Sequence, residues 1–448
     1  MTADFLGEEQ ANVSPRLTDL SIRFWILLIA TGIAAGLGAI VMMWVLRSVQ
    51  HLALNYHTGE YSRAAAHVSQ LRLITVLSIG GIVTGLGLWI LRGHGGTGGE
   101  PTDVVWNRRG KLFLIRTLLS GALSEITVAL GGSVGREAAP QRSGAAAADR
   151  LARYFKLTSA ERRVLIACGA GAGLSAVYNV PLAGALFTLE IYLGEISISM
   201  ALPALLSSAI ATATAWITLP RHAIYSIPTL PDASIPLIAF ALAVGPVIGI
   251  ISAGYVKMIA WASDHQPKRW LLILEPVIAF TLLGIVATQY PLLLGNGVDL
   301  AQFAFIGTAG IFTLLALTVL KPLATALCFR SGATGGLFTP TLSFGAILGT
   351  LLGHLWNLFW PGAPMASYSV VSAGAMLGAA AEAPLVGAAF ILELTRTSAG
   401  AMVPILIAVA GATLSSRHID MRSIYTARLT STIAKTDKKP TQPRQAGQ

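Results

Sequence analysis

The stretch Gly135-Arg136-Glu137-Ala138-Ala139-Pro140 places a carboxylate between a glycine-rich loop and a helical run. The loop contains Gly131 and Gly132, and the run extends from Pro140 to Leu151. Proline is tolerated in the first turn of a helix, because its missing N–H group removes no hydrogen bond there. Glu137 therefore belongs at the positive end of a helix dipole, among backbone N–H groups that have no helical partner.

A helix end of this kind binds anions, and Glu137 supplies an anion from within the chain. We interpret Glu137 as a tethered competitor for an anion that passes through the protein. The alternative is that Glu137 only caps its own helix, and the local sequence favours neither interpretation.

The composition around this stretch is that of a polytopic membrane protein. Hydrophobic residues make up 54% of the chain and charged residues only 12%, whereas a soluble globular chain has about one-quarter charged residues. The run from Phe24 to Leu46 carries no charge and is long enough to cross a bilayer. The 46 glycines suit packed membrane helices, because glycine lets helix backbones approach closely. A large soluble core is therefore disfavoured.

The formal net charge is +10, and the basic residues gather in the ranges 92–111, 150–163 and 417–439. These clusters lie between or after apolar runs. The positive-inside rule therefore predicts that they lie on the cytoplasmic side of the membrane, and we do not interpret them as a nucleic-acid surface. The first ten residues contain three acidic residues and no basic one, so we expect no cleaved signal peptide.

Cysteine and histidine give no sign of a cofactor. Cys168 and Cys328 lie in separate apolar runs, and the eight histidines have no metal-ligand spacing. We therefore expect neither a disulfide framework nor a metal or other cofactor.

The apolar runs divide the chain into two membrane halves. We expect a cytoplasmic N-terminal tail at 1–21, a first transmembrane half at 22–218, a second at 219–434 and a disordered cytoplasmic tail at 435–448. Several runs are shorter than a full crossing and begin at proline or glycine. Broken helices are typical of transporters, because irregular backbone at membrane depth is tolerated only within protein or beside a water-filled cavity.

An internal repeat relates the two halves. Residues 181–190 read PLAGALFTLE and residues 384–393 read PLVGAAFILE. The segments 170–174 and 373–377, AGAGL and AGAML, precede them at the same offset. Shared Pro, Gly, Phe and Glu residues at one offset indicate two related halves, although similarity alone does not reveal whether the halves are inverted.

Three glycine-rich segments expose backbone N–H groups, at 95–99, 131–137 and 332–340. If the helix ends that follow converge near the middle of the membrane, they form an anion site without a full positive charge. Such a site holds an anion weakly enough for rapid passage.

These segments resemble motifs of the CLC family of chloride channels and chloride/proton exchangers. The resemblance covers most of residues 24–430. Gly135-Arg136-Glu137 is similar to the family signature GREGP, residues 336–340 to GIFAP and residues 96–98 to GSGIP. Tyr425 falls where a late tyrosine is expected. The resemblance implies an all-α membrane protein, built as an inverted repeat of tilted and broken helices and assembled as a homodimer with one pore per subunit.

The resemblance also implies roles for single residues. Glu137 would be the gating glutamate, which blocks the pathway when ionised and swings aside when protonated. The hydroxyls of Thr97 and Tyr425 would bind the central anion, and the N–H groups of Leu337 and Phe338 an anion further out. The implied anion-binding set is Thr97, Gly98, Arg136, Leu337, Phe338 and Tyr425.

The chain departs from the family pattern at several positions. Thr97 replaces the usual serine and keeps the hydroxyl donor, whereas Gly99-Glu100 replaces Ile-Pro and Ala138-Ala139-Pro140 replaces Gly-Pro. Ile191 stands where coupled exchangers typically carry an internal proton-accepting glutamate. Isoleucine cannot carry a proton, which favours channel-like or loosely coupled transport and a likeness to the bacterial ClcB-type branch.

Other carboxylates within apolar runs are functional candidates by default. We expect Glu190 and Glu393 to accept hydrogen bonds at helix ends, and we keep Glu125 as a possible substitute proton relay. Arg142, five residues after Glu137, has no assigned role. The remaining carboxylates of this kind are Glu275 and Glu382.

The sequence therefore predicts chloride movement across a bacterial inner membrane, through a voltage- or pH-gated channel that acts as an electrical shunt. A Cl⁻/H⁺ antiporter with an atypical internal proton route is the first alternative. A membrane-embedded enzyme would need a nucleophile–base pair or metal ligands that the chain does not recognisably supply. A cation carrier is disfavoured because N–H groups are donors, and a fluoride carrier because Thr97 and Tyr425 keep the hydroxyl pair expected for chloride.

Overall fold

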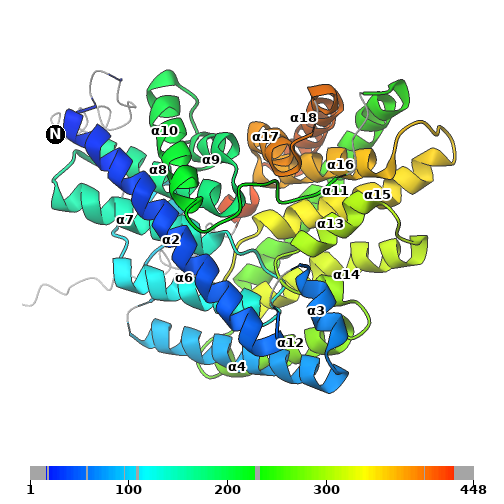
Figure 1. The fold of residues 1–448 in the computed structure, drawn as a ribbon, viewed down its shortest axis with the longest axis horizontal. Coiled ribbons are helices and arrows are strands. Elements are labelled where there is room, and N and C mark those ends of the chain that lie inside the picture. The colour runs from blue at the N-terminus through cyan, green and yellow to red at the C-terminus, as the bar shows by residue number, and fades with distance from the viewer. Residues whose placement is uncertain are drawn as a thin grey trace, which may run out of the picture.

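The computed structural model describes residues 17, 20–56, 59–94, 96–106, 110–227, 233–397 and 399–427. Almost all of the expected N-terminal tail, Gly95 of the first glycine-rich segment, and the expected disordered tail at 435–448 lie outside these residues. The described chain is helical throughout, as Figure 1 shows, and this confirms the all-α fold class.

The helices follow one another closely along the chain. In order, they are α2 (Ile22–Leu54), α3 (Tyr61–His67), α4 (Gln70–Gly93), α5 (Pro101–Trp106), α6 (Leu114–Ala129), α7 (Ala138–Tyr154), α8 (Ser159–Tyr178), α9 (Pro181–Phe187), η2 (Thr188–Leu193), α10 (Ile198–Ala215), α11 (Ile235–Asp264), α12 (Leu271–Ala287), η3 (Pro291–Leu293), α13 (Val298–Ile306), α14 (Ile311–Arg330), α15 (Phe338–Asn357), α16 (Met365–Ala381), α17 (Pro384–Thr395), η4 (Ala399–Ala401) and α18 (Met402–Ile419).

Tilted and broken helices are both present. Among the described residues, 7 helices are long and apolar enough to cross a membrane, and they include α2, α11 and α15. Helix α2 has 33 residues and is therefore about 50 Å long, well over the roughly 30 Å thickness of the hydrocarbon core. It crosses the molecule obliquely in Figure 1. By contrast, α9 has 7 residues and α17 has 12, so neither spans the hydrocarbon core.

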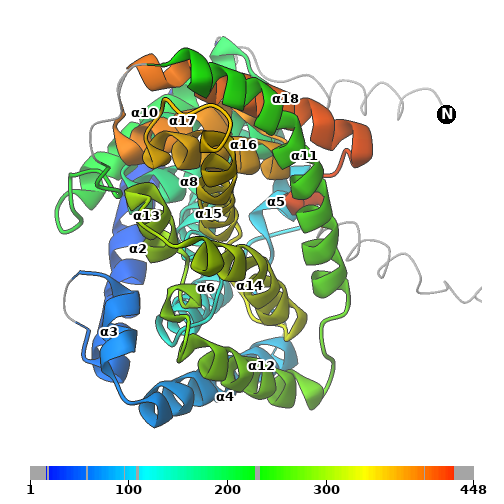
Figure 2. The ribbon, with the colours of Figure 1, turned by 90° about the vertical axis from the view of Figure 1, so that its right-hand side faces the viewer.

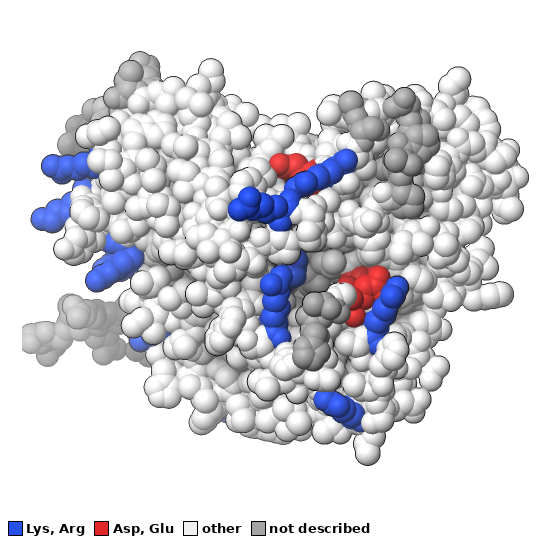
Figure 3. Space-filling view, in the orientation of Figure 1, with Lys and Arg blue, Asp and Glu red and all other residues white. Residues whose placement is uncertain are grey.

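The outer surface suits lipid. Exposed apolar side chains follow one face of α2 at intervals of three or four residues, among them Ile22, Ile26, Ile29, Ile33 and Leu37. A soluble protein would place polar side chains on such a face. Figure 3 shows a largely uncharged surface with few scattered charges. Figures 1 and 2 both show α4 beside α12 at one end of the molecule.

Small residues bring the inner helices together. Helices α7 and α8 pack closely, and a Cβ atom added at Gly169 of α8 would lie 2.8 Å from the carbonyl carbon of Gly144. Only glycine permits this approach, as expected for packed membrane helices.

The repeat segments cap each other's helices. Glu190 of η2 accepts hydrogen bonds from the N–H groups of Leu385 (3.2 Å) and Val386 (2.7 Å) at the start of α17. Glu393 of α17 in turn accepts from Leu182 (3.1 Å) and Ala183 (2.6 Å) at the start of α9. The predicted role of both glutamates at helix ends is therefore confirmed.

Candidate functional site

Two helix N-termini meet at the centre of the site. Helix α7 begins after Glu137 and α15 begins after Leu337. An antiparallel bridge joins the two approaches, because Gly135 and Gly336 exchange N–H···O hydrogen bonds of 2.7 Å in both directions. Helix α7 starts two residues before Pro140, which lies in its first turn as expected. The positive ends of two helix dipoles thus converge at one point.

The Glu137 carboxylate occupies the N-terminal end of α15. Its Oε1 accepts from the N–H group of Phe338 at 2.7 Å, and its Oε2 accepts from the Tyr178 hydroxyl at 3.0 Å and the Thr339 hydroxyl at 3.3 Å. The Tyr178 and Thr339 hydroxyls also contact each other. The Glu137 side chain makes no capping bond to α7, so the alternative that it only caps its own helix is wrong.

This carboxylate is buried without an ion pair. Glu137 is 1% exposed, and among the described residues no lysine, arginine or histidine nitrogen forms an ion pair with it. Neutral donors and helix ends therefore supply the whole local stabilisation of its charge.

Glycine at the two bridge positions makes room for this side chain. A Cβ atom at Gly336 would lie 2.8 Å from Cγ of Glu137, and one at Gly135 would lie 2.5 Å from its Cδ. These distances are shorter than van der Waals contact allows, so a Cβ atom at either position would displace the Glu137 side chain from this place.

A cavity of about 490 Å³ adjoins the carboxylate. Its wall includes Glu137, Thr97 of the loop after α4, Leu337 and Tyr425. The structure thus brings together four of the residues that the sequence analysis selected. Tyr425 also packs against Phe187, with 5.8 Å between ring centroids.

The other three selected residues do not line this cavity. Phe338 gives its N–H group to Glu137, while its ring packs on Phe390 with 4.0 Å between centroids. The Gly98 carbonyl accepts from the N–H group of Phe113 (3.0 Å) and the Thr117 hydroxyl (3.2 Å). The Arg136 guanidinium carbon lies 5.2 Å from the centroid of the Tyr178 ring. Anion binding by Gly98, Arg136 and the other selected residues stays a prediction.

Sequence reasoning missed Tyr178 and Thr339 as partners of Glu137. Thr339 belongs to the 336–340 segment. Its hydroxyl lies beside a helix end and can donate a hydrogen bond there. Tyr178 ends α8, just before the Pro181 repeat segment, and no local pattern marks its hydroxyl. Its position depends on how α8 packs against α7.

The remaining membrane carboxylates have different surroundings. Glu275 pairs with Arg330 (2.5 Å) and Glu382 with Arg417 (3.8 Å). Glu125 of α6 is 0% exposed, and neither of its carboxylate oxygens has a hydrogen-bond partner among the described residues. The charged groups that act on it are Arg136 and Glu137.

The position of the missing internal glutamate is buried. Ile191 is 6% exposed, and its carbonyl accepts from the Trp106 indole N–H at 3.2 Å. Among the described residues, no group of three or more His, Cys, Asp or Glu side chains is arranged to hold a metal ion.

Comparison with known proteins identifies a matching family and a similar fold. Residues 89–417 match the family described as voltage gated chloride channel. The chain is 31% identical to a putative chloride channel protein ClcB-like from Ralstonia nicotianae, over 89% of this chain and 94% of that protein. It is 29% identical to the voltage-gated ClC-type chloride channel ClcB from Salmonella typhimurium, over 89% of this chain and 97% of that protein.

A solved structure has the same fold. The structure of a slow cyanobacterial Cl⁻/H⁺ antiporter superposes with a TM-score of 0.82 and covers 94% of this chain and 100% of that chain. The two sequences are 21% identical, so this likeness concerns the fold alone.

Proposed function

The chain belongs to the CLC family of voltage-gated chloride channels, and on this premise we propose that it moves chloride across a bacterial inner membrane through a pathway gated by Glu137. As a family member it is a multi-pass membrane transport protein and not an enzyme. We further propose that it works as a homodimer and that channel-like conduction is its primary mode.

The position of the Glu137 carboxylate carries this proposal. One N–H group and two hydroxyls hold it at the start of α15, and these neutral donors suit a chloride ion equally well. The ionised side chain therefore competes with chloride for one place. Protonation removes the negative charge that the helix end attracts, so the side chain leaves and a permeating anion takes its place.

The residue at position 191 supports conduction without protons. Ile191 is buried and has no titratable group, so the route by which coupled exchangers typically pass protons inward is interrupted here. Chloride would then flow down its electrochemical gradient and act as an electrical shunt.

A Cl⁻/H⁺ antiporter is the second candidate, and Glu125 favours it. A buried carboxylate without a hydrogen-bond partner is costly in its ionised form. Arg136 and Glu137 are the charged groups that act on Glu125, so the charge of Glu125 is coupled to that of the gate.

Glu137→Gln tests the gate. Glutamine resembles the protonated side chain in shape but never becomes negative, so the variant should transport chloride at a rate that does not depend on pH. The wild-type rate should instead increase by up to about tenfold for each unit of falling pH while the ionised form dominates, since one proton opens the pathway.

The measurement is chloride efflux from liposomes that contain purified protein, at several pH values. Glu60→Gln is the control, because Glu60 pairs with Arg63 away from the site. A Glu137→Gln variant that transports chloride with the pH dependence of the wild type would contradict the proposal.

A further inference from the structure

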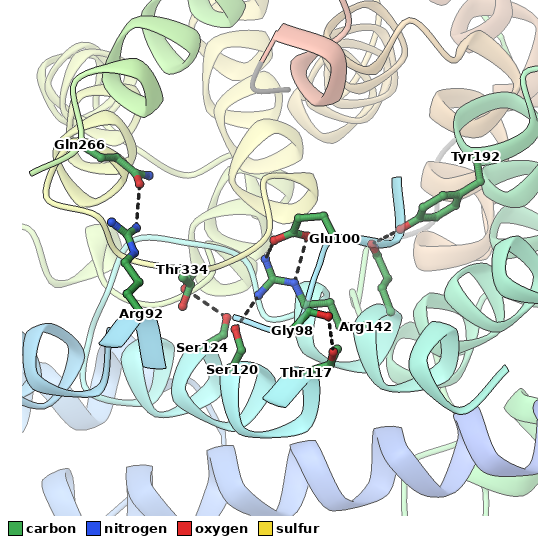
Figure 4. A network of polar contacts seen from close by, with 11 residues as sticks. Arg92, Gly98, Glu100, Thr117, Ser120, Ser124, Arg142, Tyr192, Gln266 and Thr334 are labelled. Carbon is green, nitrogen blue, oxygen red and sulfur yellow. Dashed lines mark hydrogen bonds and ion pairs between the residues drawn. The ribbon is translucent and has the colours of Figure 1, made fainter. Parts of the chain in front are cut away.

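Glu100, a departure from the family pattern, and Arg142, which had no assigned role, are partners in the structure. Glu100 precedes α5 and Arg142 lies on α7, and Figure 4 shows one guanidinium holding both carboxylate oxygens. Arg142 Nε donates to Glu100 Oε2 at 3.2 Å, and Arg142 Nη2 donates to Oε1 over a still shorter distance. Arg142 Nη1 also contacts the Ser120 hydroxyl of α6, at 3.4 Å. A bidentate pair of this kind is strong and fixed in orientation.

The Glu100–Arg142 pair lines the cavity that adjoins the Glu137 carboxylate. Glu100 and Arg142 line the same cavity as Thr97, Glu137 and Tyr425. The Arg142 side chain is 7% exposed and the Glu100 side chain 39% exposed. The guanidinium is therefore buried behind a carboxylate that remains accessible from the cavity.

Arg142 differs from the other cations on this wall. Arg92 and Lys268 are exposed, and Arg92 also donates to Gln266 at 3.1 Å. Among the described residues that line the cavity, Arg142 is thus the one buried cation. A guanidinium keeps its charge at any physiological pH, so it always needs an anion beside it.

Two anions can meet this need, the Glu100 carboxylate or an ion from the cavity. We propose that Arg142 is a second anion-binding group of the pathway, separate from the Glu137 position, and that Glu100 is the carboxylate that competes there with chloride. The inference rests on the proposed function, because it assigns the same ion to the site.

Other titratable and charged groups surround the pair. Asp103 of α5 and Tyr192 of η2 both interact electrostatically with Glu100. The Tyr192 hydroxyl donates to Gln141, the residue before Arg142, at 3.3 Å. The remaining charged residues on the cavity wall are Arg92, Glu137, Asp264 and Lys268.

Glu100→Gln tests the competition directly. The amide keeps the size of the side chain but lacks its charge, so chloride should bind the purified variant on the order of tenfold more tightly, which is the scale of one charge-assisted hydrogen bond. Asp103→Asn is the matched control, because it removes the same charge from the same cavity without releasing Arg142. Isothermal titration with sodium chloride in detergent measures both affinities.

The double variant Glu100→Gln/Arg142→Gln separates the site from general electrostatics. It removes both charges together, so it avoids leaving one buried ion unpaired, and the gain in affinity should disappear. Equal gains in Glu100→Gln and Asp103→Asn, or a gain that persists in the double variant, would overturn the inference.

Diffraction from Glu100→Gln crystals grown in sodium bromide locates the ion. We expect an anomalous peak beside the Arg142 guanidinium, and a peak only near Glu137 would reject the second site. Glu137→Gln is titrated in parallel. Suppose that Glu137→Gln and the wild type both bind and transport chloride, and that Glu100→Gln binds chloride no more tightly than the wild type. Only the second site then fails. If none of them binds chloride, the proposed function fails as well.

Discussion

At the Glu137 carboxylate, hydrogen bonds come from one backbone N–H group and two hydroxyls. A lysine or arginine in the same place would hold a permeating anion much more tightly, because its full positive charge adds Coulombic attraction to the hydrogen bond. The neutral donors are therefore compatible with the proposed exchange of carboxylate and chloride at this position.

Tyr178→Phe should weaken the hold on the ionised gate. The variant removes one hydroxyl donor and leaves the Phe338 and Thr339 donors in place. The lost hydrogen bond to the carboxylate is worth about 1.5 kcal/mol, so we expect chloride efflux at neutral pH to rise by roughly tenfold.

Tyr225→Phe is the matched control for this measurement. Tyr225 is also fully buried, and its hydroxyl has no hydrogen-bond partner among the described residues. Slower efflux in Tyr178→Phe, with intact folding, would contradict the expected role of the hydroxyl.

The selection of Glu137 from the sequence was possible because glycine, glutamate and proline follow one another there. Its partners were not predictable in the same way. Tyr178 reaches Glu137 only through the packing of α8 on α7, and the contact between Glu100 and Arg142 joins two segments that are 42 residues apart. Neither contact leaves a periodic pattern in the chain.

Among the helices, α9 and α17 depend on each other for their N-terminal caps. Glu393 satisfies the two N–H groups at the start of α9, and Glu190 satisfies two at the start of α17. Each carboxylate also lies at the positive end of a helix dipole. The repeat predicted that these glutamates lie at helix ends, but not that the caps are exchanged, since similarity between halves does not identify contacts between them.

Glu190→Gln and Glu393→Gln should each lower the free energy of unfolding by about 1–2 kcal/mol, the usual value of a lost helix cap. Because α9 and α17 pack together, the double variant need not equal the sum of the two. Thermal unfolding of the purified protein in detergent checks this expectation.

Glu60→Gln is a suitable control for the cap variants too, because its ion pair with Arg63 is exposed and contributes little. If both cap variants unfold at the wild-type temperature, the exchanged caps do not stabilise the fold.

Over the whole molecule, the proposed pathway is lined by residues from both parts of the chain. Helix α7 and Thr97 come from the first part, while α15 and Tyr425 come from the second. The family resemblance, the membrane class and the all-α fold followed from the sequence, because composition and short motifs carry them. The choice between a channel and an exchanger depends on proton movement, which no motif records directly.

The reversal potential distinguishes these two modes. For a channel, it should follow the chloride gradient alone, with a shift of about 59 mV per tenfold change in concentration. Reversing the pH gradient across the bilayer should leave it unchanged. Recordings from reconstituted protein under opposed chloride and proton gradients provide the measurement.

A reversal potential that moves with the pH gradient would identify a Cl⁻/H⁺ antiporter. Glu125→Gln should then abolish the proton-dependent part of the shift and leave chloride transport intact. Glu60→Gln is the control here, since it removes a carboxylate that pairs with Arg63 away from the site.

The exchanged caps also have a consequence for biosynthesis. When the ribosome has made α9, the N–H groups of Leu182 and Ala183 have no carboxylate to bind, because Glu393 follows them by 211 and 210 residues. Until then the nascent chain holds unsatisfied donors, which are costly in lipid. We therefore expect premature termination before α17 to yield a fragment that membrane proteases degrade rapidly.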